Sequence, residues 1–361
     1  NNIEDKLLTT EHLPSGVAST FISSDGERTF GTYLGAAASL KAEDLTLEMF
    51  KGYAYLFIEG YLVQDHEMIL HAIELAKEAG VTGFCYYHYW FNGKRLMERP
   101  VDEIISSGKP DFPFMICWAN ENWARNWDGG FKHLLMEQQY TDEDDAAHMD
   151  FLCSHIFSDR RYIRVNGKPF FAIYKAHLLP NAEKTIKIWR EVAQKHQMEL
   201  YLALFEHTGY NIPEYLSKGF DMSINFQPFC MGKFQHCKML FNITLSKLLN
   251  RKITMLHSYK KYVKYRIKTP LPSYRQFPCV TPNFDNASRR MHKGFTAFIG
   301  STPQLYGKWL SSVFEKFKPY SQEENFIFIN AWNEWAEGNH LEPDQKWGRK
   351  YLEETKKNID Q

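Results

Sequence analysis

Two glutamates lie three residues apart in the run Trp332-Asn333-Glu334-Trp335-Ala336-Glu337 near the C-terminal end of the chain. Cleavage or transfer of a glycosidic bond at neutral pH needs two carboxyl groups in different protonation states, one acid and one base or nucleophile. Like charges close together, packed against Trp332 and Trp335, would keep one of the two protonated. The run therefore predicts that Glu334 and Glu337 are the catalytic pair of a carbohydrate-active enzyme, with Asn333 orienting a sugar hydroxyl.

A second cluster spans residues 118–128 and mixes aromatic with polar side chains. Sugars present flat C–H faces that stack on aromatic rings, and hydroxyls that need amide or carboxylate partners. Arg125 and Asp128 could equally form an ion pair within the loop. We expect stacking from Trp118, Trp123 and Trp127, and hydrogen bonds from Asn120, Glu121, Arg125 and Asp128.

Further polar and aromatic residues follow short apolar runs in the same way. His88, His177, His207 and Glu206 lack the spacing of a metal site, so no metal is expected and these histidines are predicted to line a pocket. Together with the three tryptophan-motif residues Trp332, Asn333 and Trp335, the expected substrate contacts are Tyr87, His88, Tyr89, Trp90, Tyr174, Asn225, Asn283 and Asp285.

These clusters need a scaffold that brings strand ends together. Eight short apolar runs read as buried strands, and helical patterns lie between several of them, at residues 66–79, 145–157, 185–197 and 302–317. Alternating strands and helices predict an α/β protein, a (β/α)8 TIM-like barrel, in which every strand exit meets at one face. The strands are expected at residues 53–58, 83–87, 114–118, 170–174, 200–205, 222–226, 278–281 and 326–330.

The overall composition limits the classes of partner that can be expected. The 361 residues carry 43 basic and 43 acidic side chains, so charge gives no reason to expect nucleic acid or an anionic membrane. No apolar run is long enough to span a bilayer. The six cysteines lack a metal or redox spacing, and Cys85 and Cys117 lie in strand-like runs, so buried thiols and a cytoplasmic location are expected. The basic stretch 227–277 reads as a solvated helical insertion, or as a lid or platform for a nucleotide diphosphate.

Residues 81–361 resemble the WbsX-type glycosyltransferase family, also described as glycoside hydrolase family 99-like. The motifs that carry the resemblance are residues 83–94 (GFCYYHYWFNGK), 110–114 (PDFPF), 118–123 (WANENW), 127–129 (WDG), 330–338 (NAWNEWAEG) and 341–344 (LEPD).

The resemblance implies a TIM-like barrel that acts in the synthesis of bacterial surface polysaccharide, such as O-antigen or capsule, on an oligosaccharide or polysaccharide. It implies no cofactor beyond a nucleotide-sugar donor. Related hydrolases are retaining endo-α-mannosidases, in which the first motif glutamate takes a proton from the sugar 2-hydroxyl and the second acts as acid. By position, Glu334 is the base and Glu337 the acid. An endo-α-mannosidase-like hydrolase and an inactive sugar-binding protein are the alternatives.

Residues 1–80 resemble an internal fragment of a ribokinase-type (PfkB) carbohydrate kinase, through residues 15–21 (SGVASTF), 25–30 (DGERTF), 33–37 (YLGAA) and 55–61 (YLFIEGY). The G-A-G-D motif of such kinases is absent, so this segment is expected to be non-catalytic. We expect two domains, residues 1–80 and 81–361. In this arrangement strand 53–58 and helix 66–79 would replace the first strand–helix unit of the barrel.

Overall fold

The computed structural model describes residues 17–22, 28–33, 66–125, 130–228, 254–290 and 295–360. The chain divides into two compact units, residues 1–71 and 72–361. In the first unit, β1 (Val17–Ile22) pairs antiparallel with β2 (Arg28–Tyr33). The described residues of the predicted site all belong to the second unit.

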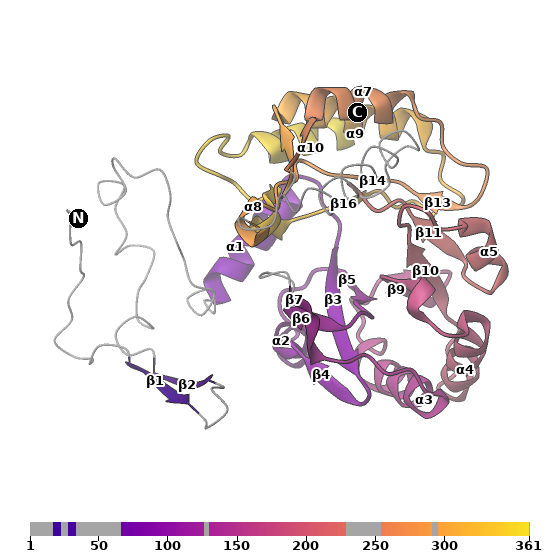
Figure 1. Cartoon of the computed structure of the whole chain (residues 1–361). Coiled ribbons are helices and arrows are strands. Elements are labelled where there is room, and N and C mark those ends of the chain that lie inside the picture. Colours follow the sequence, from indigo (N-terminus) through magenta and orange to yellow (C-terminus); the bar gives the residue numbers. More distant parts are fainter. Residues whose placement is uncertain are drawn as a thin grey trace, which may run out of the picture. The chain divides into compact units, whose positions relative to one another are not determined.

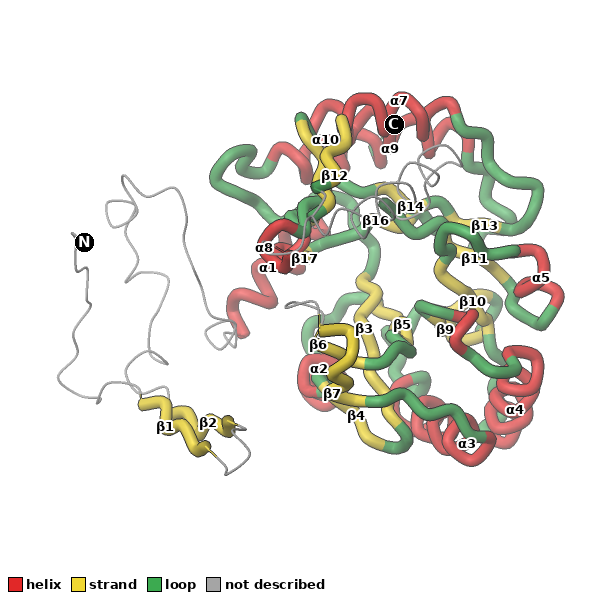
Figure 2. The backbone as a smooth tube through the Cα atoms, in the orientation of Figure 1, coloured by secondary structure: helices red, strands yellow, loops and turns green. Residues whose placement is uncertain are grey.

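The second unit is built on parallel strands that follow one another in chain order (Figures 1 and 2). Each neighbouring pair in this series is parallel, and β14 (Cys279–Val280), one residue beyond the last of them, pairs parallel with β16 (Phe328–Ile329). Sequential parallel pairing is the strand order of a (β/α)8 barrel. The series is β3 (Phe84–Phe91), β5 (Phe114–Trp118), β9 (Lys168–Ile173), β10 (Tyr201–Phe205), β11 (Met222–Ile224) and β13 (Gln276–Phe277).

Helices lie between these strands, and Figure 1 shows α3, α4 and α5 outside the arc of strands. No helix within the described ranges is both long and apolar enough to cross a membrane. The helices are α1 (His66–Glu78), α2 (Arg99–Ser107), α3 (Asp142–Phe151), α4 (Ala182–Lys195), α5 (Ile212–Ser217), α7 (Tyr259–Lys268), α8 (Ala287–Arg290), α9 (Pro303–Lys316) and α10 (Lys350–Ile359).

Short strands decorate the loops. They are β4 (Lys94–Leu96), β6 (Trp123–Arg125), β7 (Gly130–Met136), β8 (Arg164–Val165), β12 (Met255–Ser258), β15 (Thr296–Ile299), β17 (Asn333–Glu334) and β18 (Asn339–His340).

Side-chain caps start the helices where the sequence predicts starts. Thr141 accepts a hydrogen bond from the Asp144 amide at 3.1 Å, and Thr302 accepts one from Leu305 at 3.3 Å. Such caps satisfy amides that have no partner inside the helix. The helix expected at residues 145–157 is confirmed, but it begins three residues earlier, at Asp142, and continues beyond Phe151 as a π-helical turn, Leu152–Ile156.

The core explains why the strands read as continuous apolar runs. All five residues of β5 and all five of β10 are buried, because side chains on one face fill the interior and those on the other meet helices. Trp189 of α4 is fully buried against Phe171 of β9, with ring centroids 5.6 Å apart.

The two ends of the strand series meet through side chains. The Trp332 ring, just beyond β16, lies 5.5 Å from the Phe84 ring at the start of β3. Leu75 and Ala79, in and just after α1, pack in one cluster with Tyr351 and Leu352 of α10. Contact between the first and last helices is the arrangement expected of a closed ring.

Seven of the eight expected strands are confirmed, most with shorter bounds. The remaining expected strand, residues 53–58, lies outside the described residues. Its role as a replacement for the first strand of the barrel therefore stays a prediction. The expected domain boundary at residues 80 and 81 also stays a prediction. One expectation is wrong: Cys85 is exposed, whereas Cys117 is buried.

Replacing Phe84 with alanine should lower the free energy of unfolding by about 3 kcal/mol, since Phe84 joins Trp332 to Phe112 across the ends of the strand series. Urea denaturation followed by circular dichroism measures the loss. Phe314→Ala on α9, where the side chain is 39% exposed, is the matched control and should change stability much less. Equal losses in the two variants would contradict this account of closure.

Candidate active site

The two predicted catalytic glutamates lie at opposite ends of one tight turn. β17 pairs antiparallel with β18, with Glu334 opposite Asn339, and a single 3₁₀ turn, Trp335–Glu337, connects the two strands. Both glutamates are half-buried. The turn follows β16, so it lies at the carboxyl end of the strand, where barrel enzymes carry their catalytic groups.

Hydrogen bonds from the loop after β14 hold this turn in place. The Asp285 amide donates to the Glu337 carbonyl at 2.6 Å, and the Ser288 hydroxyl donates to the Ala336 carbonyl at 2.6 Å. The Asn283 side-chain amide donates to the Gly338 carbonyl at 3.0 Å. Three successive carbonyls of the turn are therefore fixed by one neighbouring loop.

Gly338 ends the turn in a left-handed conformation, with φ of 55°. A Cβ atom at this position would lie 3.1 Å from the Cβ of Asp285. Both the backbone conformation and the close approach therefore favour glycine here.

The pKa of Tyr174, at the end of β9, depends on the acids that lie near it. Burial raises the pKa of its phenol well above the usual value, and the charges of Glu121 and Glu337 raise it further. A carboxylate affects a phenol in this way only at short range. Glu121, just after β5, and Glu337, after β16, therefore both lie close enough to Tyr174 for their charges to act on its phenol.

Aromatic rings that the sequence singled out form a row that includes Tyr174. Tyr87 is 41% exposed, and its ring lies 5.9 Å from Tyr174 and 6.3 Å from Tyr89. Tyr89 in turn lies 5.0 Å from the Trp123 ring. The structure brings four of the predicted substrate contacts together, with one ring substantially open to solvent.

Asn120 has a different role from the one expected. It is 0% exposed, its Nδ2 donates to the Lys175 carbonyl at 2.9 Å, and its Oδ1 accepts from the Lys175 amide at 2.8 Å. Both ends of the amide are engaged, so Asn120 joins the loops after β5 and β9 instead of binding a hydroxyl. Beside it, Glu121 forms an ion pair with the Lys175 ammonium.

Three predicted contact residues lie below the site, in the core. Trp118 is 1% exposed, and Trp90 and His88 are also buried. His88 and His148 lie with their Nε2 atoms 3.0 Å apart, and the Trp90 ring stacks on His148 at 4.7 Å. Because protein covers these rings, they cannot stack on a sugar. The prediction that they contact substrate is therefore wrong, and they pack in the core beneath the site.

Asn225 is likewise buried, in a network around Glu206. The Glu206 carboxylate accepts hydrogen bonds from Ser223, Gln276 and Asn225 at 2.7–3.0 Å. The side-chain Oδ1 of Asn225 accepts a hydrogen bond from the Arg266 guanidinium of α7 at 2.7 Å. The described part of the basic insertion contains the predicted helix as α7, which has a buried face, and also the strands β12 and β13. Arg266 of α7 reaches the end of β11. Sequence reasoning did not single out Arg266, because nothing in its basic run distinguishes it.

The remaining predicted residues are placed as follows. Trp335 is 48% exposed, stacks on His340 with centroids 3.6 Å apart, and donates to Glu342 at 2.5 Å. Asn333 is exposed, and Asp285 accepts from the Ala287 amide at 2.9 Å. Arg125 lies in β6, while Trp127 and Asp128 fall outside the described residues.

The other histidines at the strand exits have protein partners. The His207 ring donates to the Tyr174 carbonyl at 2.8 Å, and His177 bonds the Tyr210 hydroxyl. Burial lowers the pKa of His207 to about 4, so its ring is neutral near pH 7. In the part of the chain that the structure describes, no group of three or more His, Cys, Asp or Glu residues is arranged to hold a metal.

Comparison with known proteins agrees with this geometry. A family model described as glycosyltransferase WbsX matches residues 58–355. Two proteins named uncharacterized protein WxcX, from two strains of Xanthomonas campestris pv. campestris, are 31% identical over 300 residues, covering 82% of this chain and 42% of theirs. The chain thus spans less than half the length of these curated relatives.

Two solved structures share the fold. One is titled a glycoside hydrolase-like protein, with a TM-score of 0.55, 13% identity and coverage of 82% of this chain and 86% of its own. The other is the GH99 endo-α-mannosidase from Bacteroides thetaiotaomicron, with a TM-score of 0.52, 14% identity and coverage of 82% and 79%. These likenesses establish the (β/α)8 barrel.

Replacing Gly338 with alanine should reduce both stability and turnover, because the new Cβ meets Asp285 and shifts Glu337. We expect a loss of about 1–2 kcal/mol in the free energy of unfolding from the left-handed backbone alone. Gly348→Ala is the matched control, since Gly348 has φ of 53° with open space around it. If both variants lose stability and only Gly338→Ala loses additional turnover, the account holds. Equal turnover in the two would contradict it.

The buried histidine pair should make the protein sensitive to acid. Burial, with a smaller effect of the Arg95 charge, lowers the pKa of His88 from 6.5 to about 3. Between these values the unfolded chain binds a proton that the folded chain does not. The free energy of unfolding should therefore fall as the pH drops from 6.5 toward 3, by up to about 1.4 kcal/mol per pH unit for each such histidine.

Denaturation at pH 7, 5.5 and 4.5 measures this slope. His88→Gln should flatten it, whatever its effect on stability at pH 7, and the exposed His155→Gln is the control. An unchanged slope in His88→Gln would refute the assignment.

Proposed function

Since the chain belongs to the WbsX glycosyltransferase family of glycan-active enzymes, we propose that it transfers a sugar to a glycan and uses Glu334 and Glu337 as its acid–base pair. One observation carries the proposal. Glu337 lies on a turn fixed at the end of β16, and its charge reaches Tyr174 at the end of β9 together with that of Glu121. A carboxylate on a fixed turn near a row of aromatic rings, of which Tyr87 is open to solvent, suits a sugar substrate.

The proposed reaction has two steps. In the first, Glu334 takes the proton of the donor sugar's 2-hydroxyl, O2 attacks the anomeric carbon, and Glu337 gives its proton to the departing oxygen. In the second, the acceptor hydroxyl opens the 1,2-anhydro ring and passes its proton to Glu337, while Glu334 returns its proton to O2. Both glutamates regain their starting states, and the anomeric configuration is retained.

The surroundings supply aromatic and neutral polar groups for this chemistry. Tyr87, Tyr89, Tyr174 and Trp123 supply aromatic faces, and His207 presents a neutral ring beside Tyr174. Glu121, beside Asn120 on the loop after β5, forms an ion pair with Lys175. We assign Glu121 and Lys175 to binding, and Glu334 and Glu337 to proton transfer.

The proposed donor is a nucleotide sugar, and the proposed product is a bacterial surface polysaccharide such as O-antigen or capsule, in line with the family's description as a glycosyltransferase. The described cysteines are free thiols, which supports synthesis in a reducing, cytoplasmic setting. We further propose that residues 1–80, which resemble a kinase fragment, contribute no catalysis. Phosphate transfer from ATP by the purified chain would contradict that assignment.

Glu334→Gln and Glu337→Gln should each lower turnover by roughly 10²–10⁴-fold, because each removes one proton-transfer group. Turnover is measured by product analysis with nucleotide-sugar donors and with α-mannosides. Glu353→Gln, an exposed acid on the outer helix α10, is the matched control and should retain activity.

Release of sugar from an α-mannoside without any nucleotide sugar would replace the transferase with an endo-α-mannosidase-like hydrolase that uses the same pair. Full activity in both glutamine variants would remove the pair from the mechanism altogether.

A further inference from the structure

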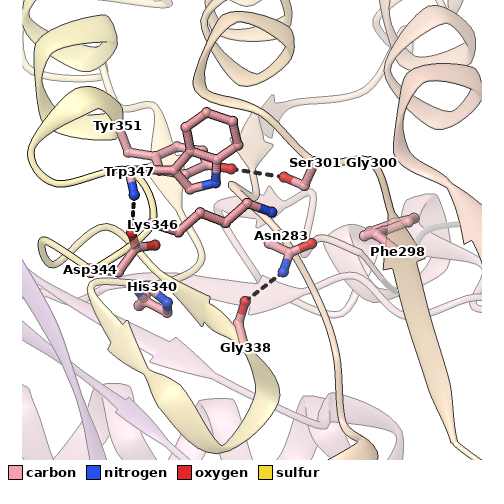
Figure 3. A pocket seen from close by; sticks show the side chains of 10 residues that line it. All are labelled: Asn283, Phe298, Gly300, Ser301, Gly338, His340, Asp344, Lys346, Trp347 and Tyr351. Atoms are coloured by element: carbon pink, nitrogen blue, oxygen red, sulfur yellow. Dashed lines mark hydrogen bonds between the residues drawn. The ribbon is translucent and has the colours of Figure 1, made fainter. Parts of the chain in front are cut away.

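A cavity of about 190 Å³ lies beside the catalytic turn (Figure 3). Gly338 and His340, at the end of the turn, form part of its wall, and Asn283, from the loop that holds the turn, forms another part. Trp347 and Tyr351 come from the segment that leads into α10 and from α10 itself. None of the substrate contacts predicted from sequence lies in this cavity except Asn283.

The side chains around the cavity offer both hydrogen-bond donors and acceptors. Asp344 supplies a carboxylate, and its Oδ1 accepts from the Trp347 amide at 2.5 Å. The Ser301 hydroxyl donates to the Pro282 carbonyl at 2.6 Å and lies 2.9 Å from the Tyr351 hydroxyl, so both oxygens offer mainly acceptor lone pairs. The Lys346 ammonium lies 5.1 Å from the centre of the Trp347 ring, and Figure 3 shows both on the side of the cavity opposite Gly338.

Asn283 gives an independent sign that a polar ligand belongs here. Its Nδ2 donates to the Gly338 carbonyl, while its Oδ1 is buried and has no hydrogen-bond partner among the described residues. A buried acceptor without a partner costs about 1–3 kcal/mol, so native proteins rarely leave one unsatisfied. Because Asn283 lines the cavity, a hydroxyl donor from a ligand there would satisfy this oxygen once the side chain turns its Oδ1 into the cavity.

This combination fits a sugar better than an anion. A pyranose ring needs an aromatic face for its C–H groups and a mixture of acceptors and donors for its hydroxyls. A phosphate would be repelled by the Asp344 carboxylate. The volume is below the roughly 300–1,000 Å³ of pockets for drug-sized ligands, which suits one ring and not a nucleotide.

We propose that this cavity is a saccharide subsite that holds one neutral hexopyranose unit of the glycan bound at the neighbouring turn. This inference rests on the proposed function, which supplies the reaction that the bound glycan undergoes. Binding itself needs no turnover, so it can be measured whether or not the proposed chemistry is correct. Because Gly338 and His340 border the cavity, an occupied subsite would set the position of the chain relative to Glu337.

Saturation-transfer NMR and calorimetry on the full chain test the subsite, with the methyl α-glycopyranosides of mannose, glucose, galactose and N-acetylglucosamine as probes, and inorganic phosphate as the anion. At least one glycoside should bind the parent and Glu337→Gln, and should bind Trp347→Ala and Asp344→Asn at least tenfold more weakly. Asparagine keeps the Oδ1 that accepts from the Trp347 amide, so Asp344→Asn leaves the loop intact.

Lys350→Ala is the matched control, because Lys350 lies 6.0 Å from the Trp347 ring but does not line the cavity. It should bind the glycoside as the parent does. Trp347→Phe, which keeps an aromatic face, covers the case in which Trp347→Ala fails to fold, and should bind with an intermediate affinity. Undiminished binding in the cavity variants, no binding of any glycoside to the parent, or preferential binding of phosphate would each overturn the proposal.

Discussion

The site depends on three hydrogen bonds that the loop after β14 makes to the carbonyls of Ala336, Glu337 and Gly338. They fix a turn whose two acids would otherwise sample many orientations at the end of a two-residue strand. Electrostatic and proton-transfer catalysis both require groups that are already in position when charge develops. Gly338 permits this close approach, because any larger residue would meet Asp285. The turn is therefore positioned by the segment that follows the neighbouring strand β14.

Buried residues beneath the site hold the loops after β5 and β9 in place. Asn120 joins the loops after β5 and β9 through both ends of its amide, and this pairing sets Lys175 and Glu121. Below them, Trp118 packs against the neutral His148. Such a buried polar layer is stable because nearly all of its polar atoms have hydrogen-bond partners, and it holds the residues above it in fixed positions. These buried residues thus support the row of rings that contains the exposed Tyr87.

Much of this arrangement can be predicted from sequence, because strands covered on both faces leave apolar runs and helix starts leave cap residues such as Thr141 and Thr302. The exits of those strands locate the site. The sequence does not distinguish which aromatic residue of a cluster is exposed. Tyr87 and His88 are adjacent, yet strand alternation exposes one and buries the other. Arg266 and the residues around Asn283 were missed for a related reason, because their roles arise only when segments distant in the chain meet.

In the proposed mechanism, Glu334 takes a proton from the sugar 2-hydroxyl while Glu337 protonates the departing oxygen. The most direct measurement compares turnover of a donor that the protein accepts with turnover of its 2-deoxy counterpart, which lacks the oxygen that must attack. We expect the parent donor to react and the 2-deoxy donor to give no product above background, although it still binds. Turnover of the 2-deoxy donor at a rate equal to or above that of the parent would contradict the assignment of the pair.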